Sequence, residues 1–179
     1  MRLPILPYGQ FQKLNQSAES AKELVKPIDF IFSKKIFRDI PITITAGKHG
    51  WVGPERSLHI KDEISVMTQL HEAFHYFMCE PERLRFDDFG LGWGSESFGL
   101  EAVKRETSPW LAKAEEEAVC VLTICAAKQL RIPMHAIINE MNYASMGDAT
   151  QDEYTSNIEF IKSRNLECFG FKMEFPPIG

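Results

Sequence analysis

The chain has 179 residues, of which 44% are hydrophobic and 25% charged, and its formal net charge is −5. This length and composition suit one globular domain with a continuous core. The modest negative charge and the lack of a Lys/Arg cluster argue against a nucleic-acid surface. No apolar run approaches the ~18–20 residues of a membrane span, and the four cysteines form no CxxC pair. We therefore expect a single soluble, cytoplasmic domain over residues 1–179.

The first third of the chain predicts one helix followed by short strands. Apolar residues recur at helical intervals over residues 10–26, and Pro27 ends that helix. A turn-rich segment with three glycines covers residues 47–54. Strands are expected on both sides of this segment, at residues 28–32, 41–46 and 57–61.

The next helix, expected over residues 62–79, carries the HExxH pattern as His71-Glu72-Ala73-Phe74-His75. Two histidines four residues apart lie on the same helix face, so both imidazoles can reach one metal ion. Glu72 can then take a proton from a water molecule at the metal, which makes it the candidate catalytic residue. The alternative is a pair of structural histidines, but burying imidazoles without a ligand costs free energy.

A glycine-rich loop is expected after this helix. Residues 86–99 interleave four glycines with Phe and Trp, which suits neither a regular helix nor a packed strand. Such a loop can cover a substrate, with aromatic rings for contact and glycines for bends. It can equally be a surface loop whose aromatic rings fill the core.

A second long helix is expected from Ser108 to about Leu130, because Ser108 is a suitable cap and Pro109 suits the first helical position. Two more helices are expected at residues 134–145 and 151–164, and residues 168–175 would either add a terminal strand or lie along the core. These elements predict an α+β fold with a small, mostly antiparallel sheet packed on long helices. The HExxH helix would then belong to a zincin-like core.

Two histidines need a third protein ligand to hold a catalytic metal with open positions. Glu115 lies at the centre of the most apolar face of the second long helix, whereas Glu117 is one turn from Lys113 and forms an exposed pair with it. A carboxylate on an apolar face needs a partner, and a metal is a natural one. The spacing from Glu115 to Ala118 also resembles the third-ligand segment of HExxH…E metallopeptidases. The alternative, three solvated glutamates, stays open because this helix is apolar almost all round.

The motifs of residues 57–130 resemble those of the elongation factor P hydroxylase family. The HExxH run is followed, thirteen residues after its second histidine, by Asp88-Phe89-Gly90 with Trp93 close behind. A helix with glutamates and a Cys/Ala-rich stretch then follows over residues 115–127. In that family the same features occur in the same order.

This resemblance implies a non-haem iron centre held by two histidines and one carboxylate. The implied reaction is O₂-dependent hydroxylation of a modified lysine on a partner protein, elongation factor P or a similar protein. His71 and His75 would bind the metal and Glu115 would be the third ligand. Asp88 and Trp93 would shape the mouth through which the substrate enters.

The residues themselves leave both the metal and the reaction open. Two histidines and one carboxylate suit Fe(II) and equally a catalytic Zn(II). In a zinc metallopeptidase Glu72 would be the general base, and a peptide could pair with a strand at residues 57–61. A third possibility is a non-catalytic interaction module that the metal stabilises. No HxD pair occurs, which argues against a 2-oxoglutarate oxygenase.

Overall fold

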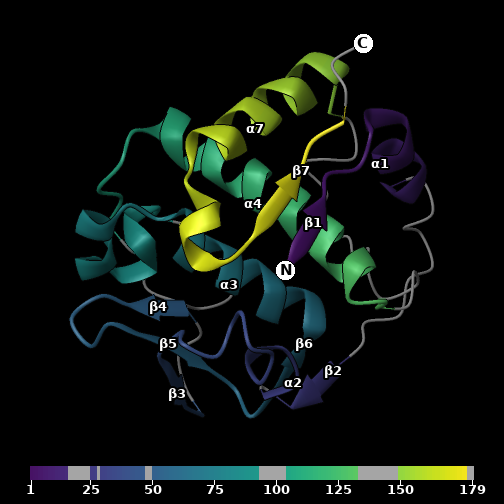
Figure 1. Ribbon diagram of the computed structural model, residues 1–179. Coiled ribbons are helices and arrows are strands. Elements are labelled where there is room, and N and C mark those ends of the chain that lie inside the picture. The colour runs from purple at the N-terminus through teal and green to yellow at the C-terminus, as the bar shows by residue number, and fades with distance from the viewer. Residues whose placement is uncertain (16–24, 28, 47–49, 93–103, 133–148, 177–179) are drawn as a thin grey trace.

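Three helices form the centre of the computed structural model, which describes residues 1–15, 25–27, 29–46, 50–92, 104–132 and 149–176. Helix α4 (Pro109–Gln129) lies between α3 (Val66–Met78) and α7 (Gln151–Ser163) and packs against both (Figure 1). Two shorter helices precede them, α1 (Tyr8–Asn15) and α2 (Asp29–Phe32). The HExxH helix and the helix with the three glutamates are therefore direct neighbours.

The strands form three small sheets of mixed direction, in contrast to the mostly antiparallel sheet that the sequence predicted. Among the described strands, two pairings are parallel and two are antiparallel. The first and last described strands pair with each other, and the central strand of the three-stranded sheet has a parallel neighbour on one edge and an antiparallel neighbour on the other. The parallel pairs are β1 (Arg2–Pro4) with β7 (Lys172–Glu174) and β3 (Ile42–Ile44) with β5 (Ser57–Ile60). The antiparallel pairs are β2 (Val25–Pro27) with β6 (Glu63–Ser65) and β4 (Gly50–Val52) with β5.

The long helices confirm the sequence prediction most closely. Helix α4 begins at Pro109, and the Ser108 side chain accepts a hydrogen bond from the Leu111 backbone N–H as an N-cap. Helix α7 falls within the predicted range and begins with a capping box. Helix α3 begins at Val66, later than predicted, because residues 63–65 pair with β2 as a strand.

Shorter elements were predicted less well. The strand expected at residues 28–32 is wrong, because Asp29–Phe32 form the helix α2. The preceding strand, β2, ends at Pro27. The expected turn segment contributes β4. The first predicted helix, residues 10–26, corresponds to α1 up to Asn15, but its predicted end is wrong because Val25 and Lys26 belong to β2. Residues 16–24 and the helix expected at residues 134–145 lie outside the described residues. The described elements make an α+β fold, and they do not by themselves identify a zincin-like core.

The core explains why α4 is apolar all round. Ten consecutive residues of α4, 118–127, are buried because α3 covers one side of the helix and α7 the other. A second part of the core is aromatic, where Phe37 and Phe171 contact Phe74 and Phe77 of α3. Among the described residues, no helix combines the length and apolar character that crossing a bilayer requires.

Candidate metal centre

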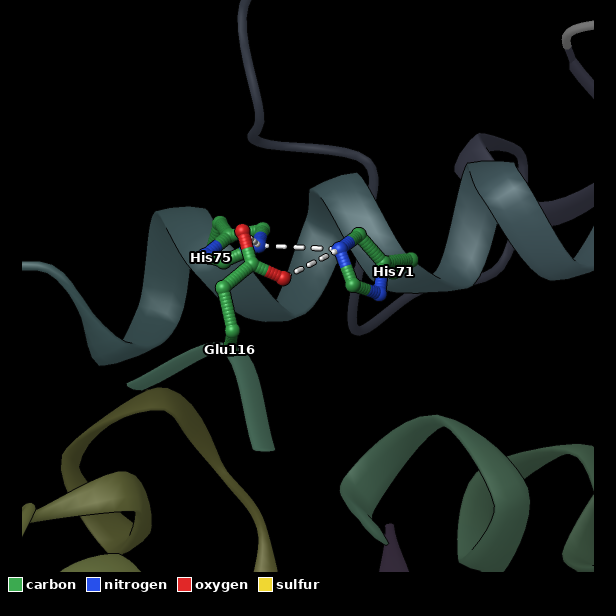
Figure 2. Close-up of side chains that lie close together, drawn as sticks. All are labelled: His71, His75 and Glu116. Atoms are coloured by element: carbon green, nitrogen blue, oxygen red, sulfur yellow. Dashed lines mark hydrogen bonds and ion pairs between the residues drawn. The ribbon is translucent and has the colours of Figure 1, made fainter. Parts of the chain in front are cut away.

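The two histidines of the HExxH motif face a carboxylate of α4. Figure 2 shows that the rings of His71 and His75 project from α3 toward the Glu116 carboxylate. The Nε2 atoms of the histidines lie 2.9 Å apart. One oxygen of Glu116 lies 3.3 Å from Nε2 of His71, and the other lies 3.3 Å from Nε2 of His75. Potential ligand atoms of three residues on two neighbouring helices thus lie close together, with one atom of each residue within 4.8 Å of the others.

The spacing of these atoms fits one transition-metal ion. With bonds of about 2.1 Å, neighbouring ligand atoms lie about 3.4 Å apart around a tetrahedral ion and about 3.0 Å apart around an octahedral one. The Nε2–Nε2 distance of 2.9 Å and the two 3.3 Å distances, which end on different oxygens of Glu116, lie close to this range. Imidazole nitrogen and carboxylate oxygen suit Zn(II) and Fe(II) alike. The donor set therefore fits a divalent transition metal and does not distinguish between these two.

The electrostatics of the site favour a positive charge between the three side chains. Burial acts to lower the pKa of His75, but the carboxylates of Glu116 and Glu115 outweigh it and raise this pKa well above its ordinary value. Burial likewise opposes ionisation of Glu116, yet His75 and His71 hold the pKa of its carboxyl below its usual range. The same arrangement that attracts a proton attracts a metal cation, so the two compete for the site.

Glu115, the third ligand expected from the sequence, has a different place. Its side chain is fully buried, as its position on the apolar face predicted. It forms an ion pair with Arg83, and its Oε1 lies 3.5 Å from Nδ1 of His75, on the opposite side of that ring from Nε2. The group that could hold a metal contains Glu116 in its place. The difference arises because α4 directs Glu115 into the protein interior, whereas the Nε2 atoms face the edge of the helix interface.

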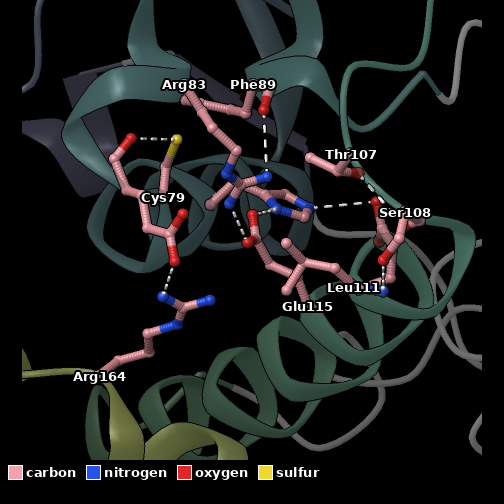
Figure 3. A network of polar contacts seen from close by, with 11 residues as sticks. Cys79, Arg83, Phe89, Thr107, Ser108, Leu111, Glu115 and Arg164 are labelled. Atoms are coloured by element: carbon pink, nitrogen blue, oxygen red, sulfur yellow. Dashed lines mark hydrogen bonds and ion pairs between the residues drawn. The ribbon is translucent and has the colours of Figure 1, made fainter.

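Besides Glu116, this region contains a second residue that the sequence did not predict, Arg83. It lies in the 3₁₀-helix η2 (Pro81–Arg85), directly after α3, and its side chain is buried. Figure 3 shows its guanidinium between the carboxylate of Glu115 and the backbone carbonyl of Phe89, to which Nη1 donates at 3.1 Å. A charged residue in the short link after a motif helix was the available signal, since such a link must lie close to that helix.

The Asp88-Phe89-Gly90 segment packs directly against the site. It forms the 3₁₀-helix η3 (Asp87–Gly90), and the Phe89 ring stacks on the His75 ring with centroids 5.7 Å apart. The Phe89 ring also stacks on the ring of Trp51 in β4, with centroids 5.1 Å apart. Asp88 and Phe89 both have positive φ, an unusual backbone conformation that the surrounding contacts must hold.

Two of the remaining residues predicted for the site, Glu72 and Asp88, are described in the structure. Glu72 is half-buried on α3, next to His71 in the chain. Asp88 is half-buried in η3, beside the ring that covers His75. Trp93 lies outside the described residues. The structure thus brings the two histidines together with Glu116, and it puts Asp88 near them without making it a potential ligand.

No family model, curated protein or solved structure matches this chain. The resemblance to elongation factor P hydroxylases therefore stays a prediction from the sequence motifs.

Proposed function

We propose that this protein is a metal-dependent enzyme in which His71, His75 and Glu116 hold one divalent transition metal. We further propose that it is a hydroxylase similar to the non-haem iron enzyme that acts on elongation factor P. The observation that carries the second step is the stacking of Phe89 on His75, with ring centroids 5.7 Å apart and planes 22° from parallel. The motif that supports the resemblance beyond HExxH thus contacts a proposed metal ligand.

The residues of the chain have separate roles in this proposal. His71 and His75 bind the metal through Nε2, and Glu116 binds it through its carboxylate. When bound, Fe(II) in such a site supplies the capacity to activate O₂. Glu72 follows His71 on the same helix, and its carboxylate serves to hold or move a proton at this end of the site. Phe89 shields one face of the His75 ring from water.

A zinc metallopeptidase is the second candidate, and a specific observation favours it. The HExxH residues lie on a helix, and the carboxylate that completes the group comes from the next long helix of the described chain. In this alternative Glu72 is the general base that accepts a proton from the attacking water. Both candidates act on a protein or peptide, and both need the same three ligands.

Metal analysis of the purified protein tests the proposal first. Protein prepared without added metal, under anaerobic conditions, should contain about one transition metal per chain, and the variant H71A/H75A should contain none. The same result with Fe(II), together with O₂ consumption that depends on a protein substrate, supports the hydroxylase.

The two candidates give opposite outcomes in the remaining assays. Zinc at one per chain, with peptide cleavage that Glu72→Gln abolishes, would overturn the hydroxylase in favour of the peptidase. A wild-type protein that binds no transition metal, and whose melting temperature chelators leave unchanged, would overturn both.

A further inference from the structure

We infer that Glu115, held in place by Arg83, is a positioning residue that sets the orientation and tautomer of His75 in the metal site. This inference rests on the proposed metal centre and deepens it. It assigns a role to the two buried charges that lie beside the site without belonging to the group of potential ligands.

The carboxylates of Glu116 and Glu115 lie at different nitrogens of the His75 ring. Nε2 faces His71 and Glu116, whereas Nδ1 lies 3.5 Å from Oε1 of Glu115. Both Nδ1 and Oε1 are buried, and neither forms a hydrogen bond among the described residues, so each is available to the other across 3.5 Å. A metal can bind Nε2 only if that nitrogen keeps its lone pair, so the proton of a neutral ring must be on Nδ1. Glu115 is the acceptor that favours this tautomer.

Arg83 restrains the His75 ring from two directions. One end of its guanidinium pairs with Glu115, which faces the edge of the His75 ring. Its second terminal nitrogen, Nη1, donates to the carbonyl of Phe89, whose ring stacks on the face of His75. A single buried cation therefore fixes both the group at the edge of the imidazole and the group on its face.

A contribution to stability alone does not explain the buried ion pair of Arg83 and Glu115. Buried ion pairs contribute little net stability, because desolvation of both charges offsets their attraction. A tightly packed apolar pair would serve a purely structural purpose as well. The location of the carboxylate at Nδ1 of a potential ligand is what a positioning role requires, and partners of this kind raise metal affinity by about 10- to 100-fold.

Co(II) binding measured by visible absorption tests the inference, because the d–d bands report the ligand geometry as well as the affinity. We expect Glu115→Gln to weaken Co(II) binding about 10- to 100-fold and to shift the bands. Glu117→Gln is the matched control on the same helix, since Glu117 pairs with the exposed Lys113 at 2.9 Å. This control should leave both the affinity and the spectrum unchanged.

A double variant separates positioning from stability. Arg83→Met alone leaves Glu115 as an unpaired buried charge, so the metal-free protein should melt at a lower temperature. Adding Glu115→Gln removes that charge and should restore the melting temperature, while Co(II) binding stays weak.

Each remaining outcome has a definite meaning. Unchanged affinity and spectrum in Glu115→Gln would overturn the inference while leaving the proposed metal centre intact. Recovery of Co(II) affinity together with melting temperature in the double variant would show a structural role only. Failure of the wild-type protein to bind Co(II) would overturn the metal centre and this inference together.

Discussion

The two halves of the candidate metal centre differ in their exposure to solvent. The inner half, defined as Arg83, Phe89, Glu115 and His75, is buried, with exposed fractions of 0–6%. The outer half, defined as His71, Glu72 and Glu116, is half-buried. A catalytic metal needs fixed ligands on one side and open positions on another. The inner half is suited to fixing the geometry, and a substrate would have to approach from the outer half.

Replacing the two histidines in turn should expose this difference most strongly. We expect His71→Ala and His75→Ala each to reduce metal affinity by more than about 100-fold, beyond the effect of partners that do not touch the metal. Only His75→Ala should also lower the free energy of unfolding of the metal-free protein, on the order of 2 kcal/mol, because it leaves a cavity beside the Phe89 ring. Metal titration and urea unfolding of the metal-free variants measure the two effects. Equal losses of stability would contradict the division into halves.

Glu116→Gln should give the next largest effect, mainly on metal binding. The substitution removes the anionic ligand, and we again expect a loss of at least about 100-fold in affinity. His75 and His71 hold the pKa of the Glu116 carboxyl below its usual range, so its charge stabilises the metal-free fold at neutral pH, and the variant should unfold at a somewhat lower urea concentration than the wild type. If Glu116→Gln left the metal affinity unchanged and Glu115→Gln abolished it, the third metal ligand would be Glu115, as the sequence predicted.

The same division explains how far the sequence could predict the site. The HExxH spacing predicted that two imidazoles share a helix face, and the apolar neighbours of Glu115 predicted its burial. The choice between adjacent glutamates was not predictable from periodicity, because it depends on which side of α3 faces α4. A buried carboxylate can be neutralised by a metal or by a cation, and Arg83 reaches Glu115 only after the chain turns at η2. A carboxylate for an open metal site is therefore better sought at the edge of the apolar face of a helix, as with Glu116, than at its centre, as with Glu115.

The fold shows a similar limit. The long helices were predictable because their caps and apolar spacing are local, as at Ser108. Strands of three or four residues contain too little pattern, and their direction depends on distant partners. β1 pairs with β7 from the other end of the chain, and residues 63–65 become a strand because β2 lies beside them.

A smaller effect is expected from a substitution at Gly53, which packs against the chain segment that carries Arg83 of the inner half. A Cβ at this position would lie 2.4 Å from backbone atoms of Arg85 and Phe86, so the link that carries Arg83 would have to move. We expect Gly53→Ala to cost about 1–3 kcal/mol of stability and to weaken metal binding severalfold. Gly9→Ala is the control, because nothing lies within 4 Å of its added Cβ. Normal metal affinity in a destabilised Gly53→Ala protein would show that the inner half tolerates movement of its support.

The smallest effect on the metal should come from the remote N-terminus of α7, which packs on α4. There the Thr150 hydroxyl accepts from the backbone N–H of Glu153, and the Glu153 carboxylate accepts from the backbone N–H of Thr150. Thr150→Ala should lower stability by about 0.5–2 kcal/mol and leave metal affinity unchanged.

The same cap gives a pH test in Glu153→Gln. The Thr150 backbone N–H holds the pKa of the Glu153 carboxyl below its usual value. This carboxylate therefore stabilises the fold above the unfolded-state pKa of about 4.3, and its contribution disappears as the pH falls through the lower folded-state pKa. The difference in melting temperature between wild type and Glu153→Gln should thus be present at neutral pH and vanish in acid. If either cap variant also weakened metal binding at neutral pH, loss of stability alone would account for weak binding, and the inner half would need no special role.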